Sequence, residues 1–215
     1  MSVIVENIDI FWEGVKVTLW LTAISSVIAL ALGTILAALR VSPVPILRGF
    51  SAFYVEIVRN TPITIVFFFS AFVLPQMGVR FSYFTFAVIA LSVYYASFFC
   101  EAIRSGINSV ALGQAEAARS IGFTFMKSLR LIILPQALRT VVPPLISVFI
   151  ALTKNTAVAA SFGVSELLAK MIYLADEEST AILWILAATA IFYLAITVPA
   201  GALASHLENR LRFAR

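Results

Sequence analysis

The segment Gly113–Pro135, GQAEAARSIGFTFMKSLRLIILP, sets the interpretation of the rest of this chain. Its pattern predicts two short helical pieces hinged at Gly122. A glycine N-cap at Gly113 would place the Glu116 carboxylate in the first helical turn, where the helix dipole stabilises a negative charge. Gly122 follows the run AARSI, and a glycine just past a helix takes a left-handed backbone at little cost. We therefore expect a first helix that begins at Gly113 and ends at Gly122.

The second half of the segment, Phe123–Pro135, is predicted to form another helix. Thr124 can cap its beginning. Pro135 is expected to kink or end it, because proline lacks a backbone N–H and clashes with the preceding turn. Long apolar segments flank this polar helix–glycine–helix on both sides. The arrangement favours a docking element for a partner protein.

The composition indicates a protein that crosses a lipid bilayer several times. Of the 215 residues, 61% are hydrophobic and 12% are charged, whereas about 25% are charged in soluble domains. The net charge of +4 is small and scattered, which argues against nucleic-acid binding. Cys100 is the single cysteine and His206 the single histidine, so a disulfide, a zinc site and a His-based catalytic triad lack the residues they need. We expect no metal site and no cofactor bound by this chain.

Hydropathy predicts an all-α membrane protein with five transmembrane helices in a single domain, 1–215. The five spans cover about 15–39, 50–74, 84–104, 137–160 and 180–205. Pro62 lies inside the second span. The fourth span is expected to be interrupted by Pro143, Pro144, Lys154 and Asn155.

Five spans place the two chain ends on opposite sides of the bilayer, and the basic residues orient them. The two sides differ in their number of basic residues. The less basic side holds Lys16, Arg80 and Lys170, with Lys154 near it and most of the acidic residues beside them. The more basic side holds Arg40, Arg48, Arg104, Arg119, Lys127, Arg130, Arg139, Arg210, Arg212 and Arg215. Because basic residues mark the cytoplasmic side, we expect the N-terminus outside and the C-terminus in the cytoplasm. The helix pair 113–135 is then cytoplasmic, between the third and fourth spans.

The spacing within the helix pair is specific. Glu116-Ala117-Ala118 is followed by three residues, Gly122, nine residues, Ile132, one residue and Leu134-Pro135. This spacing resembles in full the EAA loop of ABC importer permeases. Further matches are RNTP at 59–62, GQ at 113–114, PQALR at 135–139 and KNTA at 154–157, which departs slightly from the family's usual form. Together they resemble the polar amino acid uptake family, with its type I importer fold, over residues 54 to about 160.

The resemblance implies a permease subunit in the bacterial plasma membrane. Two such subunits, identical or sister chains, would enclose a translocation path, and a cytoplasmic ABC ATPase dimer carrying ATP and Mg would grip their EAA helices. An external solute-binding protein would deliver an amino acid. The chain itself contains no GxxxxGK[ST] motif, so we expect the ATP site on the partner subunit. The resemblance implies that this chain is not an enzyme. The residues implied for ATPase coupling are Gly113, Gln114, Glu116, Ala117, Ala118, Gly122, Leu134 and Pro135.

Charged and polar residues inside the spans are candidates for the substrate path, because an unpaired charge there costs about 2.5–3.5 kcal/mol. Glu56 and Arg59 are three residues apart on one helical face, and either pair with each other or contact substrate. Glu101 and Arg104 have the same spacing, which also suits a brace on the EAA element. Lys154 either attracts a carboxylate or extends to the outer interface. The candidate path residues are Glu56, Arg59, Asn60, Thr61, Glu101, Lys154 and Asn155.

Other functions remain open at this point. The substrate can be an acidic, basic or amide amino acid, of the glutamate/glutamine, arginine or histidine class, since Arg59 and Lys154 suit an anion while Glu56 and Glu101 suit a cation. An ATP-independent secondary carrier or channel is the alternative, although such a protein has no use for an ATPase-docking helix pair and usually has an inverted repeat. A membrane enzyme is poorly supplied with nucleophile–base or metal clusters.

Overall fold

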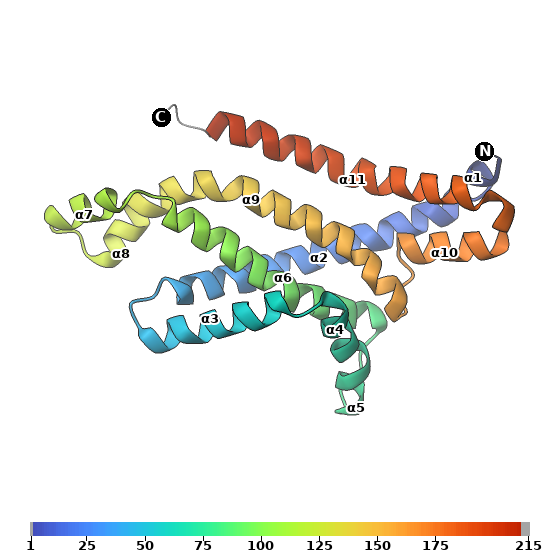
Figure 1. The fold of residues 1–215 in the computed structure, drawn as a ribbon, viewed down its shortest axis with the longest axis horizontal. Coiled ribbons are helices and arrows are strands. Elements are labelled where there is room, and N and C mark those ends of the chain that lie inside the picture. Colours follow the sequence, from blue (N-terminus) through green and yellow to red (C-terminus); the bar gives the residue numbers. More distant parts are fainter. Residues whose placement is uncertain (1, 212–215) are drawn as a thin grey trace.

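The computed structural model of the protein describes residues 2–211, and over that range it consists of helices joined by turns (Figure 1). Arg212 and Arg215, which were predicted to lie on the cytoplasmic side, are outside the described residues. The α-helices are α1 (Ser2–Glu6), α2 (Ile8–Arg40), α3 (Pro45–Asn60), α4 (Ile63–Phe68), α5 (Leu74–Gln76), α6 (Tyr83–Asn108), α7 (Leu112–Ser120), α8 (Phe125–Ser128), α9 (Leu134–Asn155), α10 (Leu167–Glu177) and α11 (Ile182–Leu211). The remaining helical turns are the π-helices η1 (Phe69–Val73) and η2 (Leu129–Ile133) and the 3₁₀-helices η3 (Thr156–Phe162) and η4 (Ser179–Ala181).

The predicted all-helical membrane architecture is confirmed. Within residues 2–211, four segments are long and apolar enough to cross a bilayer: Ile8–Arg40, Tyr83–Asn108, Phe125–Phe162 and Ser179–Glu208. A fifth crossing exists only if two helices that meet at an angle of 101°, Pro45–Asn60 and Ile63–Gln76, count as one span.

This bend divides the span expected over 50–74 into two helices, and Pro62 causes it. A proline disfavours helical backbone angles in the residue before it. Thr61 accordingly takes an extended conformation, with φ −89° and ψ 133°, and α3 ends at Asn60. The chain therefore turns sharply in the middle of an apolar segment, and α4 and α5 project away from the long helices (Figure 1).

The other prolines do not break their helices. Pro143 and Pro144 lie inside α9, so the interruption expected at these two residues is wrong. Membrane helices tolerate proline where other groups satisfy the freed backbone atoms. Pro135 does not end its helix either, because the segment Phe125–Phe162 continues through it after the π-helix η2. The α-helix does end at Asn155, as expected, and the 3₁₀ turn that follows terminates at Gly163, where φ is +84°.

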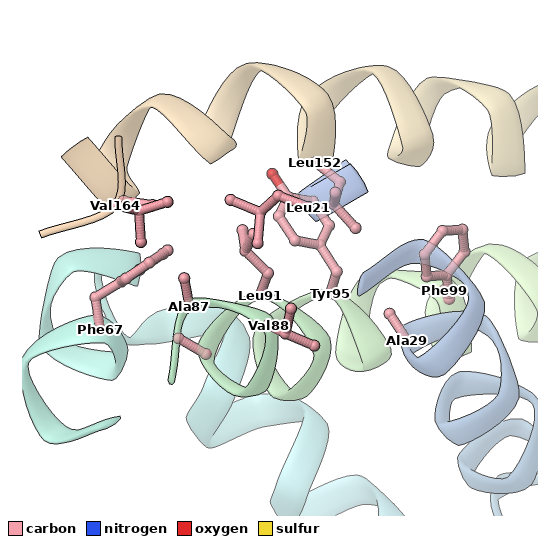
Figure 2. Close-up of a cluster of buried hydrophobic side chains, with 12 residues drawn as sticks. Leu21, Ala29, Phe67, Ala87, Val88, Leu91, Tyr95, Phe99, Leu152 and Val164 are labelled. Atoms are coloured by element: carbon pink, nitrogen blue, oxygen red, sulfur yellow. The ribbon is translucent and has the colours of Figure 1, made fainter. Parts of the chain in front are cut away.

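The core lies where α2, α6 and α9 pack together. Figure 2 shows side chains from these helices meeting in one cluster, with Phe67 of α4 at its edge. Leu21, Leu91 and Leu152, one from each long helix, are fully buried. The close approach of α2 and α6 depends on Gly33, because an added Cβ would lie 2.6 Å from Phe99 Cβ and 2.9 Å from a backbone oxygen.

Replacing Gly33 with alanine is therefore expected to destabilise the protein by about 1–3 kcal/mol, the usual cost of overpacking. Thermal unfolding of the detergent-solubilised protein measures this loss. Gly49→Ala is the matched control, since an added Cβ at this helical position has nothing within 4 Å. Equal melting temperatures for both variants would contradict the close packing of α2 on α6.

The long axis of the molecule separates two ends (Figure 1). The N-terminal helix α1 lies at one end with α10. The pair α7–α8 and the end of α11 lie at the other, with the turn between α2 and α3 nearby. The basic turn at Arg40 and the predicted docking element thus share one end of the helix bundle.

Candidate functional site

The predicted docking element begins earlier than expected. Helix α7 starts at Leu112, and its N-cap is Ala111, whose extended backbone (ψ 133°) ends the preceding turn. Gly113 is therefore the second helical residue, so its predicted N-cap role is wrong. Glu116 consequently lies beyond the first turn, which contains no acidic residue. The helix dipole falls off within the first turn, so it contributes little at Glu116.

The predicted turn at Gly122, between two helices, is present. Gly122 has φ +85°, in the left-handed region that glycine alone occupies cheaply. Its N–H donates to the Arg119 carbonyl at 2.9 Å, and the N–H of Phe123 donates to the Ala118 carbonyl at 3.0 Å. These two bonds form a Schellman motif that closes the end of α7. The Thr124 hydroxyl then accepts from the Lys127 N–H at 3.4 Å and caps α8, as predicted.

The surface of this hairpin is exposed and partly apolar. Gln114, Glu116 and Ala117 are exposed, as are Leu112 (81%) and Ile121 (70%). Ala118 differs from Ala117, because it is only 1% exposed and packs inside this chain. Leu134 is half-buried and Pro135 is exposed, at the base of the hairpin where α9 begins.

A second candidate site is a cavity of about 420 Å³ between α2, α3 and α6. It brings together four of the predicted path residues, and Thr61, Lys154 and Asn155 do not line it. Two lining residues were not predicted as part of the path: Arg40, at the end of α2, and Arg104, which was expected to pair with Glu101. The lining residues are Arg40, Val55, Glu56, Arg59, Asn60, Phe98, Glu101 and Arg104.

Glu101 is the centre of charge in this cavity. Arg104 donates to both of its oxygens, at 3.0 and 2.8 Å, as the i, i+3 spacing predicted. Arg59 and Arg40 reach the same carboxylate from α3 and α2, at 3.6 and 3.8 Å. The structure thus pairs Arg59 with Glu101 rather than with Glu56, so of the two alternatives for Glu56 and Arg59 the pair within α3 is not formed.

Aromatic residues connect this cavity to the end of α9. The Arg59 guanidinium lies over the Phe98 ring, 5.1 Å from its centroid. Phe98 contacts Tyr95, with ring centroids 5.6 Å apart, and the hydroxyl of Tyr95 accepts a hydrogen bond from the Asn155 side chain. Asn155 and Arg59 therefore stand at the two ends of a continuous row of side chains. Lys154, next to Asn155, is exposed.

The family comparison decides what these sites belong to. Residues 29–213 match the family described as "binding-protein-dependent transport system inner membrane component". This chain belongs to that family. It is accordingly a multi-pass membrane protein of a binding-protein-dependent transport system.

Relatives of this permease match over nearly its whole length. The glutamate transport system permease protein GluC of Corynebacterium glutamicum is 40% identical over 213 residues, covering 94% of this chain and 92% of the relative. The probable glutamine ABC transporter permease protein GlnP of Bacillus subtilis is 35% identical over 207 residues, covering 95% of each. A solved structure described as an amino acid ABC transporter with histidines superposes with a TM-score of 0.90 at 28% identity, covering 96% of both chains.

The permease also contains a buried carboxyl that the sequence reasoning did not single out. Glu166 is fully buried and caps α10, accepting from the Ala169 N–H at 2.9 Å. It also accepts from the Tyr193 hydroxyl at 2.7 Å and the Thr18 hydroxyl at 3.4 Å. Burial raises the pKa of this carboxyl above its ordinary value. Glu166 joins α2, α10 and α11, and the run GVSELL, an acid just before an apolar helix, was the signal that could have revealed it.

Proposed function

We propose that this chain is the permease subunit of an ATP-driven importer of polar amino acids. The observation that carries the proposal is its full-length similarity to permeases named for glutamate and glutamine transport. The similar solved structure is that of an amino acid ABC transporter. In this proposal the permease forms the translocation path and has no catalytic site of its own.

The exposed hairpin α7–α8 supports docking of a cytoplasmic ABC ATPase. Its Schellman turn and Thr124 cap fix the direction of a short lever, and Leu112 and Ile121 offer apolar contact area to a partner. ATP and Mg would bind to that partner. The proposed orientation places this hairpin and the C-terminus in the cytoplasm, and the basic residues Arg40 and Arg48 at the same end of the bundle favour it.

Two further partners complete the proposed assembly. A second permease subunit, identical or a sister chain, would cover helix faces that the single chain leaves open. Within Phe125–Phe162, only 11% of the apolar stretch long enough to cross the bilayer is buried. A solute-binding protein outside the membrane would deliver the amino acid, as the family description implies.

The proposed substrate path runs from Lys154 and Asn155 along Tyr95 and Phe98 to the cavity at Arg59 and Glu101. Tyr95 is buried, with 2% of its surface exposed, and its hydroxyl accepts a hydrogen bond from the Asn155 side chain. Tyr95→Phe would leave the Asn155 amide without this acceptor.

We expect Tyr95→Phe to lower the uptake rate by about fivefold to tenfold, the effect of losing about 1–1.5 kcal/mol from one hydrogen bond. Uptake of radiolabelled amino acid by proteoliposomes that hold the whole transporter measures it. Tyr94→Phe is the matched control, because no hydrogen bond of the Tyr94 hydroxyl is among the described contacts of this neighbouring residue. Unchanged uptake in Tyr95→Phe would remove Asn155 and Tyr95 from the path.

The experiment that tests the whole proposal is purification of the chain with its co-expressed partners and reconstitution in vesicles. L-glutamine, L-glutamate and L-arginine are then added outside with the binding protein. We expect at least one of them to raise ATP hydrolysis and to accumulate inside only when ATP is supplied. Uptake at full rate without any ATPase subunit would establish the alternative, a secondary carrier or channel.

A further inference from the structure

The cavity between α2, α3 and α6 is lined by three arginines and two glutamates, so positive charge is in excess. Both carboxylate oxygens of Glu101 accept close hydrogen bonds from Arg104. The guanidinium nitrogens of Arg59 and Arg40 lie 3.6 and 3.8 Å from the same carboxylate, within ion-pair range but beyond hydrogen-bond length. The Nη1 atom of Arg40 is buried and finds no acceptor among the described residues. A buried guanidinium N–H without an acceptor is costly, which indicates that an acceptor binds there at some stage.

The cavity also contains a second carboxylate, that of Glu56. The Glu56 side chain lines the same cavity and is exposed. It forms no ion pair with any side chain that the structure describes. The cavity thus offers two guanidinium groups with spare donors and one free carboxylate, on neighbouring helices.

This combination matches a zwitterion. Guanidinium groups bind a carboxylate through paired, charge-assisted hydrogen bonds, and a carboxylate binds an ammonium group. The volume of about 420 Å³ is within the range of small-molecule sites. Both required groups are present in every α-amino acid, whatever its side chain.

The geometry points to this cavity as a subsite for the α-carboxylate and α-ammonium groups of the transported amino acid. Arg59 and Arg40 bind the carboxylate, Glu56 binds the ammonium group, and Glu101 is the counter-ion that holds the two arginines while the cavity is empty. This inference rests on the proposed function. It also implies that discrimination between the side chains of different amino acids comes from groups outside the cavity, because the cavity binds only groups that all α-amino acids share.

The test measures ligand binding to the purified permease–ATPase complex in nanodiscs, without binding protein, by equilibrium dialysis. The radiolabelled probe is whichever of L-glutamine, L-glutamate and L-arginine supports ATP-dependent uptake. Unlabelled competitors are the same amino acid, its α-amide, which lacks the carboxylate, and its N-acetyl derivative, which lacks the ammonium group. We expect each modified competitor to bind about tenfold or more weakly than the intact amino acid, the usual effect of one lost charge-assisted bond.

Variants identify the residues. Arg59→Gln is expected to weaken binding of the amino acid by about tenfold and to bind the α-amide as well as the intact amino acid. Glu56→Gln is expected to lose discrimination against the N-acetyl derivative instead. Glu101→Gln, which releases the arginines from their counter-ion, is expected to tighten binding. Lys170→Gln is the control, because it breaks a surface ion pair with Glu13 away from the cavity and is expected to change nothing.

The outcomes are distinct. Wild-type protein that binds the α-amide as tightly as the amino acid overturns the subsite. So does Arg59→Gln that keeps wild-type discrimination, and Arg40→Gln supplies the second test if Arg59→Gln does not assemble. Weaker binding in Glu101→Gln overturns the counter-ion role. Failure of the proposed function looks different, because no amino acid of the panel would then support ATP-dependent uptake by the wild-type transporter.

Discussion

Gly122→Val is expected to lower ATP-dependent uptake strongly while the permease still assembles with its ATPase. The backbone of Gly122 has φ +85°, which costs an L-residue about 1–2 kcal/mol and is worst for β-branched side chains. To relieve this strain, the chain must give up the two hydrogen bonds that close α7. The angle between α7 and α8 then changes, and the hairpin can no longer transmit ATPase movement in a fixed direction. Uptake by proteoliposomes and ATP hydrolysis, measured on the same sample, report this separation.

The expected loss of uptake is about tenfold or more, since strain of this size corresponds to about a tenfold change in an equilibrium. Gly78→Val is the matched control, because Gly78 has φ +91° and equally open surroundings but lies in the turn after α5. Gly49→Ala is a second control, at a helical position outside the hairpin where an added Cβ has nothing within 4 Å. Normal uptake in Gly122→Val would refute the hinge. An equal loss of uptake in Gly78→Val would show that backbone strain lowers uptake wherever it lies, without a special role for Gly122.

The local signals of the docking element were mostly sufficient to predict its shape. Gly122 and Thr124 act through their own backbone and side-chain chemistry, so their roles could be inferred from their positions in the sequence. The start of α7 could not, because Ala111 has no capping side chain and only its backbone conformation marks the boundary. Gly113 was selected as a favourable cap type, although nothing in the chain required the helix to begin there.

The charged cavity contains contacts between helices that the residue spacing within one helix could not predict. The Glu101–Arg104 pair was predicted from an i, i+3 spacing and is present. The same rule left a Glu56–Arg59 pair open as one of two alternatives, and that pair is absent because Arg59 extends from α3 to Glu101 on α6. A contact between residues more than forty positions apart depends on how the helices pack, which the spacing within one helix does not determine. Arg40 was likewise interpreted only as a marker of the cytoplasmic side, since its partner lies on a distant helix.

Glu166→Leu is expected to destabilise the permease by about 3–5 kcal/mol. The carboxyl is fully buried and accepts hydrogen bonds from Tyr193 on α11, Thr18 on α2 and the N–H of Ala169 on α10. Leucine fills a similar volume but offers no acceptor, so these buried donors lose their partner, at about 1–3 kcal/mol for an unsatisfied buried group. Unfolding of the detergent-solubilised protein by heat or denaturant measures the loss.

Glu166→Gln separates the hydrogen bonds from the charge. The amide oxygen of glutamine can still cap α10 by accepting from the Ala169 N–H, and its amide nitrogen can donate to the Tyr193 hydroxyl. Because burial disfavours the charged carboxylate, this neutral replacement is expected to cost less than about 1 kcal/mol, within the range of ordinary single substitutions. If leucine and glutamine destabilised the protein equally, the charge and not the hydrogen bonding would hold α2, α10 and α11 together. If neither did, Glu166 would not join these helices at all.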